Sequence, residues 1–127
     1  MKSKIALRGG SAAMLVLVMS ACAEQPLSPG QPTSANLDLA PYATHEDCAD
    51  LVPGDRLDYR FESNAPVKFN ISYRDGNMIV LPITREEVLT DAGVFAPLIK
   101  SRYCLTWEAS ASGALVDYHA AIRRGGR

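Results

Sequence analysis

The sequence lacks a hydrophobic run long enough to cross a membrane as a helix near its start. The apolar stretch there, Ala12–Met19, has eight residues, whereas a spanning helix needs about 20 predominantly apolar residues. Acidic residues are also missing from this region, since none precedes Glu24. The short run therefore argues against a permanent transmembrane helix at this position.

Sequence motifs of common enzymes are missing as well. The chain has no G-x-S-x-G nucleophile motif, no H-E-x-x-H zinc motif and no phosphate-binding loop. The adjacent acids Glu86 and Glu87 form a carboxylate pair, but acids at an expected helix start more often complement the helix dipole. We expect the protein not to be an enzyme and to need no cofactor.

Histidine is scarce, with two residues in the chain. His45 stands beside Asp47, and His119 stands two positions after Asp117 in an expected strand. These four side chains would form an open metal site if the two segments were neighbours. Because no short ligand spacing is present, we interpret them as solvated surface residues and expect no metal site.

Positive charge is not in excess. From Cys22 onward the chain has 10 Lys and Arg against 14 Asp and Glu, a net charge of about −4. This balance argues against nucleic acid as a partner. The basic tail, residues 123–127, would suit anionic lipid headgroups or an acidic partner, but we interpret it as a solvated terminus.

The N-terminus carries an export signal. Lys2, Lys4 and Arg8 precede the short apolar run, which is the pattern of a secretory signal peptide. The segment that follows, Met19-Ser20-Ala21-Cys22, resembles a bacterial lipobox. The resemblance implies that residues 1–21 are a lipoprotein signal peptide and that Cys22 becomes the acylated first residue of the mature protein.

An ordinary signal peptide is the alternative. Ala21-Cys22-Ala23 also fits the A-x-A cleavage pattern, which would release a soluble protein that begins at Glu24. Cysteine counting supports the lipobox, because an acylated Cys22 leaves an even number of cysteines. Two or more acyl chains hold a protein stably on a bilayer. By resemblance to Gram-negative lipoproteins, Ala23 favours the outer membrane, with the protein facing the periplasm.

Residues 22–44 are expected to form a tether. Four prolines and many small polar residues occur between residues 23 and 41, and such a segment buries too little surface to offset the entropy of ordering. We predict an extended, mostly disordered spacer. The alternation of Leu37 and Leu39 is compatible with docking on the folded part.

Residues 45–122 are the expected folded domain. A chain of fewer than 80 residues buries little surface and is barely stable alone. Cys48 and Cys104 lie near the two ends of this segment, and the exported compartment is oxidising. We therefore predict a Cys48–Cys104 disulfide.

Alternation of apolar and polar residues predicts strands through most of this domain. The strands are expected at 57–62, 67–74, 78–83, 103–108 and 115–122, with a turn at 75–77 and a loop at 109–113. Residues 84–87 have the spacing of a capping box and predict a short helix or, alternatively, a polar connection. We expect an all-β fold of six or seven short strands in two sheets, with most aromatic side chains in the core.

The order of these segments resembles the GOLD-like β-sandwich of the p24 luminal type and its small exported bacterial relatives. The resemblance covers about residues 46–122 and is carried by Cys48, Pro53-Gly54-Asp55, the strand Tyr59–Ser63, Pro66–Ile71, Gly93-Val94-Phe95 and Tyr103–Trp107. It implies a jelly-roll-like β-sandwich with a disulfide between its first and late strands. The bacterial relatives often have a His-Tyr-His pattern in the second strand, where this chain has Ser72, Tyr73 and Arg74.

The resemblance also implies a protein- or lipid-interaction module rather than an enzyme. We therefore expect a lipid-anchored envelope protein whose β-sandwich binds an unknown envelope protein or ligand. The alternatives are an accessory structural subunit of an envelope complex and a weak metal-binding periplasmic protein that uses His45 and His119.

Overall fold

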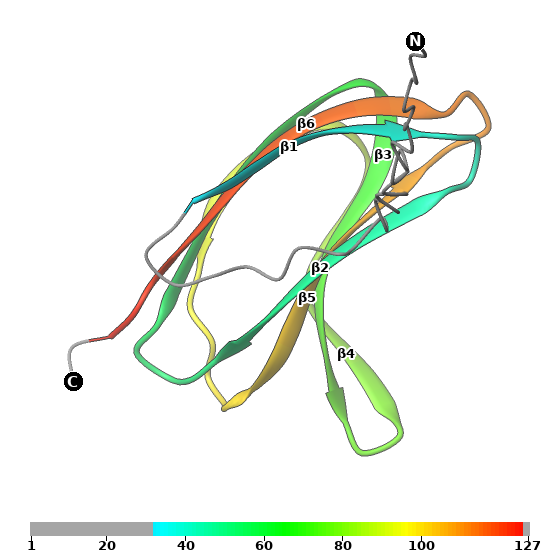
Figure 1. The fold of residues 1–127 in the computed structure, drawn as a ribbon. Coiled ribbons are helices and arrows are strands. Elements are labelled where there is room, and N and C mark those ends of the chain that lie inside the picture. Colours follow the sequence, from blue (N-terminus) through cyan, green and yellow to red (C-terminus); the bar gives the residue numbers. More distant parts are fainter. Residues whose placement is uncertain (1–31, 126–127) are drawn as a thin grey trace, which may run out of the picture.

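Every regular element in the described part of the chain, residues 32–125, is a β-strand (Figure 1). The strands of this computed structural model are β1 Thr33–Leu39, β2 Thr44–Leu51, β3 Arg56–Asp75, β4 Met78–Phe95, β5 Ser101–Ala109 and β6 Ala114–Arg123. The all-β prediction with six strands is confirmed. Within the described residues, no helix has the length and apolarity to cross a bilayer. The predicted signal peptide and Cys22 lie outside the described residues.

The six strands form one antiparallel sheet that curls over itself (Figure 1). Its strand order is β1-β6-β3-β5-β2, and β4 pairs with β3. The first part of β3 pairs with β6 and its second part pairs with β5, while β4 runs beside both parts. The two expected sheets are therefore two halves of one sheet, which face each other because β3 and β4 continue from one half into the other.

A bend in β3 joins the two halves. The pairing with β6 ends at Ser63, and the pairing with β5 begins at Val67. Between them, Pro66 has no N–H to donate to a ladder, and the side-chain oxygen of Asn64 accepts a 2.7 Å hydrogen bond from the backbone N–H of Leu115. Strands that change sheets in sandwiches do so at such bends.

The core lies between the two halves and is rich in aromatic rings. The bend brings Phe61 and Phe69 of the same strand face to face, with ring centroids 4.9 Å apart. Trp107 of β5 lies 5.3 Å from Phe69 and 4.4 Å from Tyr118 of β6. Large aromatic side chains in such contacts supply much of the stabilisation of a small core. The predicted burial of aromatic side chains is confirmed for Tyr59, Phe61, Phe69, Tyr103, Trp107 and Tyr118.

The predicted tether is too long at its C-terminal end. Residues 33–39 form β1, which pairs with β6 from Thr33↔Ala120 to Leu39↔Ala114. The alternating side chains Leu37 and Leu39 face the core, where Leu39 is buried. Because this pairing satisfies backbone hydrogen-bonding groups and buries apolar side chains, residues 33–39 belong to the folded part, which was expected to begin at residue 45.

The helix or polar connection expected at residues 84–87 is also wrong. These residues lie inside β4, where the pairing with β3 shifts by one residue between Val88 and Arg85. Glu87 has a positive φ of 50°, as an extra residue in a β-bulge can have. The capping-box spacing was misleading because β3 pairs with β4 on both sides of this segment, at Thr84 and Arg85 and again at Val88.

The predicted disulfide is present. Cys48 of β2 and Cys104 of β5 are directly opposite in the antiparallel pair and are bonded to each other. β2 pairs with β5 and with no other strand in the described part of the chain. The disulfide therefore fastens an edge strand to the body of the sheet.

The start of the basic tail is not solvated as expected. Asp55, which is fully buried, accepts hydrogen bonds from Nη1 of Arg124 at 2.8 Å and from the backbone N–H groups of Val52 at 2.9 Å and Gly125 at 3.0 Å. Burial alone would raise the pKa of Asp55, but these donors and the charge of Arg124 lower it to about 2. The carboxylate thus holds the C-terminal segment against the β2–β3 loop.

Candidate binding face

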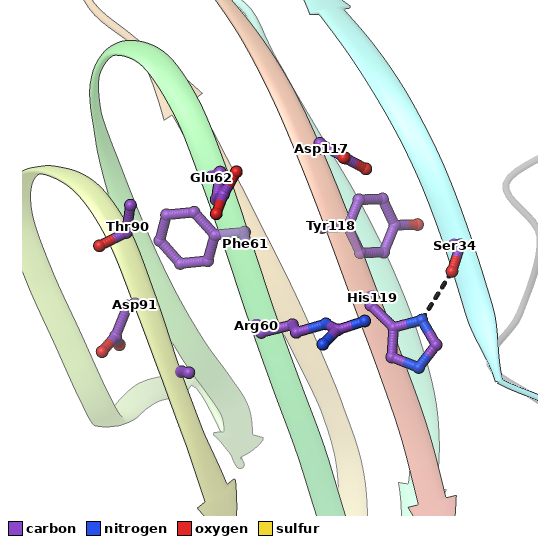
Figure 2. Close-up of a pocket in the computed structure, with 10 residues that line it drawn as sticks. Ser34, Arg60, Phe61, Glu62, Thr90, Asp91, Asp117, Tyr118 and His119 are labelled. Atoms are coloured by element: carbon purple, nitrogen blue, oxygen red, sulfur yellow. Dashed lines mark hydrogen bonds between the residues drawn. The ribbon is translucent and has the colours of Figure 1, made fainter.

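An open concavity of about 800 Å³ lies on the outer surface of the sheet half that contains β1 and β6 (Figure 2). Strand alternation points the core residues inward and leaves the residues between them on this outer face. The exposed or half-exposed residues that line the concavity on this face are Ser34, Arg60, Glu62, Thr90, Ala92, Asp117 and His119. The half-exposed Asp91 also lines it, but its carboxylate contacts Tyr59 and Arg85. We call this surface the polar face.

The register of four neighbouring strands places these side chains in two rows. The first row crosses the sheet as Ser34, His119, Arg60 and Ala92, because each is directly opposite the next. The second row, two residues further along each strand, is Asn36, Asp117, Glu62 and Thr90. Two residues of a strand span roughly 7 Å, so a basic row and an acidic row run side by side at that separation.

The basic row contains one hydrogen-bonded pair of side chains and one arginine without an ion pair among the described residues. The hydroxyl of Ser34 and Nδ1 of His119 form a 2.6 Å hydrogen bond. Arg60 extends from β3 toward His119 (Figure 2). Among the described residues, Arg60 has no ion pair. A guanidinium beside an imidazole and a hydroxyl offers several donors to a carboxylate or phosphate group.

The acidic row has the opposite preference. Glu62 and Asp117 are directly opposite each other on β3 and β6, and like charges in such a cross-strand pair destabilise a sheet. Neither carboxylate has an ion-pair partner within the described residues. A cationic group placed between them would relieve their repulsion.

The contact between Ser34 and His119 does not by itself make a catalytic centre. A serine nucleophile needs a base that a third group orients, together with donors for an oxyanion. Within residues 32–125, no side chain forms a hydrogen bond with Nε2 of His119. The arrangement shows donors and acceptors suited to binding, and the expectation of a non-catalytic protein stays a prediction.

The two histidines considered as metal ligands are not brought together. His45 lies on the inner side of β2, where its Nε2 is 3.2 Å from Oδ2 of Asp47 and its ring packs 5.9 Å from that of Tyr118. His119 follows Tyr118 in β6 and therefore faces the opposite side of the sheet. Tyr118 donates a hydrogen bond to the buried Asp47, so this carboxylate serves the core.

One other group of potential ligands occurs within the described residues. An oxygen of Glu46 and the sulfurs of Cys48 and Cys104 lie within 4.8 Å of one another. The two sulfurs are bonded to each other, and metal binding by cysteine requires thiolates. In its disulfide form this group does not provide a thiolate site.

Comparison of the chain with models of protein families gave no match, and comparison with curated proteins gave none either. The resemblance to GOLD-like domains therefore stays a prediction, as does the lipobox. The polar face was not predicted from the sequence, although strand alternation indicated that His119 and Asp117 face outward. The missing information was the strand order, which brings β1, β6, β3 and β4 together.

Proposed function

We propose that this protein is a lipid-anchored component of a Gram-negative cell envelope and that its β-sandwich is a non-catalytic binding module. The export signal and the lipobox-like segment ending in Cys22 support the anchor, and the disulfide is compatible with an oxidising compartment. The outer membrane, with the domain in the periplasm, is the proposed location.

The polar face is the observation that carries the binding role. Its basic row suits an anionic group and its acidic row suits a cationic one, at a separation of roughly 7 Å. A ligand or protein segment that carries both charges would satisfy both rows at once. Binding by this face would use preformed positions on rigid strands, which limits the entropy lost on association.

The anchor is tested by the mass of the mature protein isolated from membranes. We expect a chain that begins at Cys22 and carries acyl groups, because the lipobox cysteine is the site of attachment. The Cys22→Ser variant is expected to lose the acyl groups and to leave the membrane fraction on washing. A soluble wild-type species that begins at Glu24 would instead establish the ordinary signal peptide.

The binding role is tested by crosslinking in intact envelopes. A photoreactive residue at Thr90, on the polar face, is expected to give discrete adducts, whereas one at Lys68 on the other sheet half is not. Arg60→Gln should lower the Thr90 adducts at least fivefold, because a hydrogen bond to a charged group contributes about 1.5–3 kcal/mol. Equal adducts from Thr90 and Lys68, or no effect of Arg60→Gln, would contradict this assignment.

An accessory role in an envelope complex is the second candidate. In the described part of the chain, β1, β2 and β4 each pair on one side only, and an unpaired strand edge can accept a strand from another protein. β4 is 18 residues long and exposes Leu81 and Leu89. A photoreactive residue in place of Leu89 that gives adducts unaffected by Arg60→Gln would favour this role.

A further inference from the structure

The register of the strands places several segments at one end of the sandwich. Thr33, where the chain enters the domain, is opposite Ala120, near the end of β6. Phe95 at the end of β4 is opposite Leu57 near the start of β3, and Leu51 at the end of β2 is opposite Ser101 at the start of β5. We call this the entry end.

The entry end also includes the tip of the β3–β4 hairpin. β3 runs antiparallel to β5 with Ser72 opposite Cys104, so the last residue of β3, Asp75, reaches the level of Ser101 at the start of β5, and the turn at 76–77 lies beyond it. The turns at residues 40–43 and 110–113 lie at the opposite end, where the backbone N–H of Tyr42 donates to the carbonyl of Ser110. In Figure 1 the hairpin projects at the bottom, away from these turns at the upper right.

The start of β1 limits how far the domain can lie from the bilayer. Eleven residue steps separate Cys22 from Thr33, and a chain of that length spans at most about 40 Å. A domain of this size is roughly 30 Å across. If Cys22 is the lipid anchor, as the proposed function holds, the domain stays within little more than its own diameter of the membrane.

Large apolar side chains are exposed at this same end. Leu98 in the β4–β5 loop is 90% exposed, and Met78 and Ile79 at the hairpin are 69% and 59% exposed. The loop is held in place, because the hydroxyl of Tyr103 donates a 2.7 Å hydrogen bond to the carbonyl of Ile99. The apolar side chains therefore project from an ordered surface.

Charge is distributed unevenly along the same axis. The entry end carries six cations, Arg56, Arg74, Lys100, Arg102, Arg123 and Arg124, against the four carboxylates Asp50, Asp55, Asp58 and Asp75. Arg74, Lys100 and Arg102 are exposed and form no ion pair among the described residues. Toward the opposite end lie the exposed acids Asp38, Glu86 and Glu87, with the exposed cations Lys68 and Arg85, of which Arg85 is paired with Asp91.

We propose that the entry end docks on an anionic bilayer surface, with Leu98, Met78 and Ile79 in the headgroup region and the cations against lipid phosphates. Apolar side chains beside basic residues are the composition of interfacial membrane contacts. The short connection to Cys22 raises the local concentration of this surface at the bilayer, so a weak intrinsic affinity is sufficient. The acidic end then points away from the membrane.

The test uses the mature chain with Cys22→Ser, which removes the acyl anchor. Sedimentation with vesicles of phosphatidylglycerol and phosphatidylethanolamine is expected to recover the protein, and recovery should fall at high salt and with phosphatidylcholine alone. The variant Met78→Asp/Leu98→Asp is expected to bind at least tenfold more weakly, because it places two charges in the contact. Both positions are exposed, so the fold should be retained, which circular dichroism would verify.

Tyr42→Asp is the matched control, since Tyr42 is 68% exposed at the opposite end and its positive φ is tolerated by aspartate. It should bind vesicles like the parent chain. Three results would overturn the proposal: no binding to anionic vesicles, equal binding by the double variant, or a dimer in sedimentation velocity that Leu98→Asp abolishes. The protein in this assay carries no acyl anchor, so a failure of the anchor, detected by the mass of the mature protein, is distinguished from a failure of docking.

Discussion

Replacing both Cys48 and Cys104 by alanine is expected to lower the free energy of unfolding by about 4 kcal/mol. The bond joins residues 56 positions apart, and removing it restores the freedom of a long loop to the unfolded chain. Small domains are stable by only about 5–15 kcal/mol, so this loss is a large fraction of the total. Chemical denaturation of the Cys22→Ser chain with and without the two substitutions measures it.

The position of the bond predicts where the folded state would loosen. β2 is an edge strand whose pairing with β5 includes the Cys48↔Cys104 position. Without the bond, amide exchange should quicken first in β2, because edge strands open more easily than central ones. Intact mass should rise by two daltons on reduction of the parent chain. A loss below about 1 kcal/mol would contradict the entropic account.

Asp55→Ala is expected to destabilise the domain by about 3 kcal/mol, because it leaves a guanidinium and two backbone N–H groups without their acceptor. The residue is fully buried and connects the β2–β3 loop to Arg124 and Gly125. Asp58→Ala is the matched control. Asp58 pairs with Arg123 at the surface, and such pairs contribute less than about 1 kcal/mol.

The same carboxylate gives the fold a dependence on acid. The pKa of Asp55 is about 2 in the folded protein against an ordinary value of 3.8, so its contribution is fully present above about pH 4. That contribution is lost as the pH falls from about 4 toward 2. Stability measured over this range should fall more steeply for the parent chain than for Asp55→Ala. Parallel pH profiles for the two proteins would contradict the assignment.

Much of the architecture was determined by the sequence itself. The alternation along 57–62, 67–74, 103–108 and 115–122 specified strands and their buried faces, because a strand exposes one side to the core and the other to water. The turn at 75–77 was equally readable, since Gly76 adopts the positive φ that such a turn needs. The Cys48–Cys104 bond was predicted because the export signal implies an oxidising compartment, where cysteines pair.

Other features were decided by contacts between distant segments. Residues 33–39 have a weak strand pattern in isolation and form β1 because β6 supplies a partner edge. Residues 84–87 have a local helix signal, but the pairing along β3 outweighs it. The polar face and the entry end form only when β1, β6, β3 and β4 become neighbours. Arg124 is held in place by its hydrogen bond to Asp55, which lies 69 residues earlier in the chain. Local patterns report which side of a strand is buried, whereas strand order depends on long-range pairing that no single segment encodes.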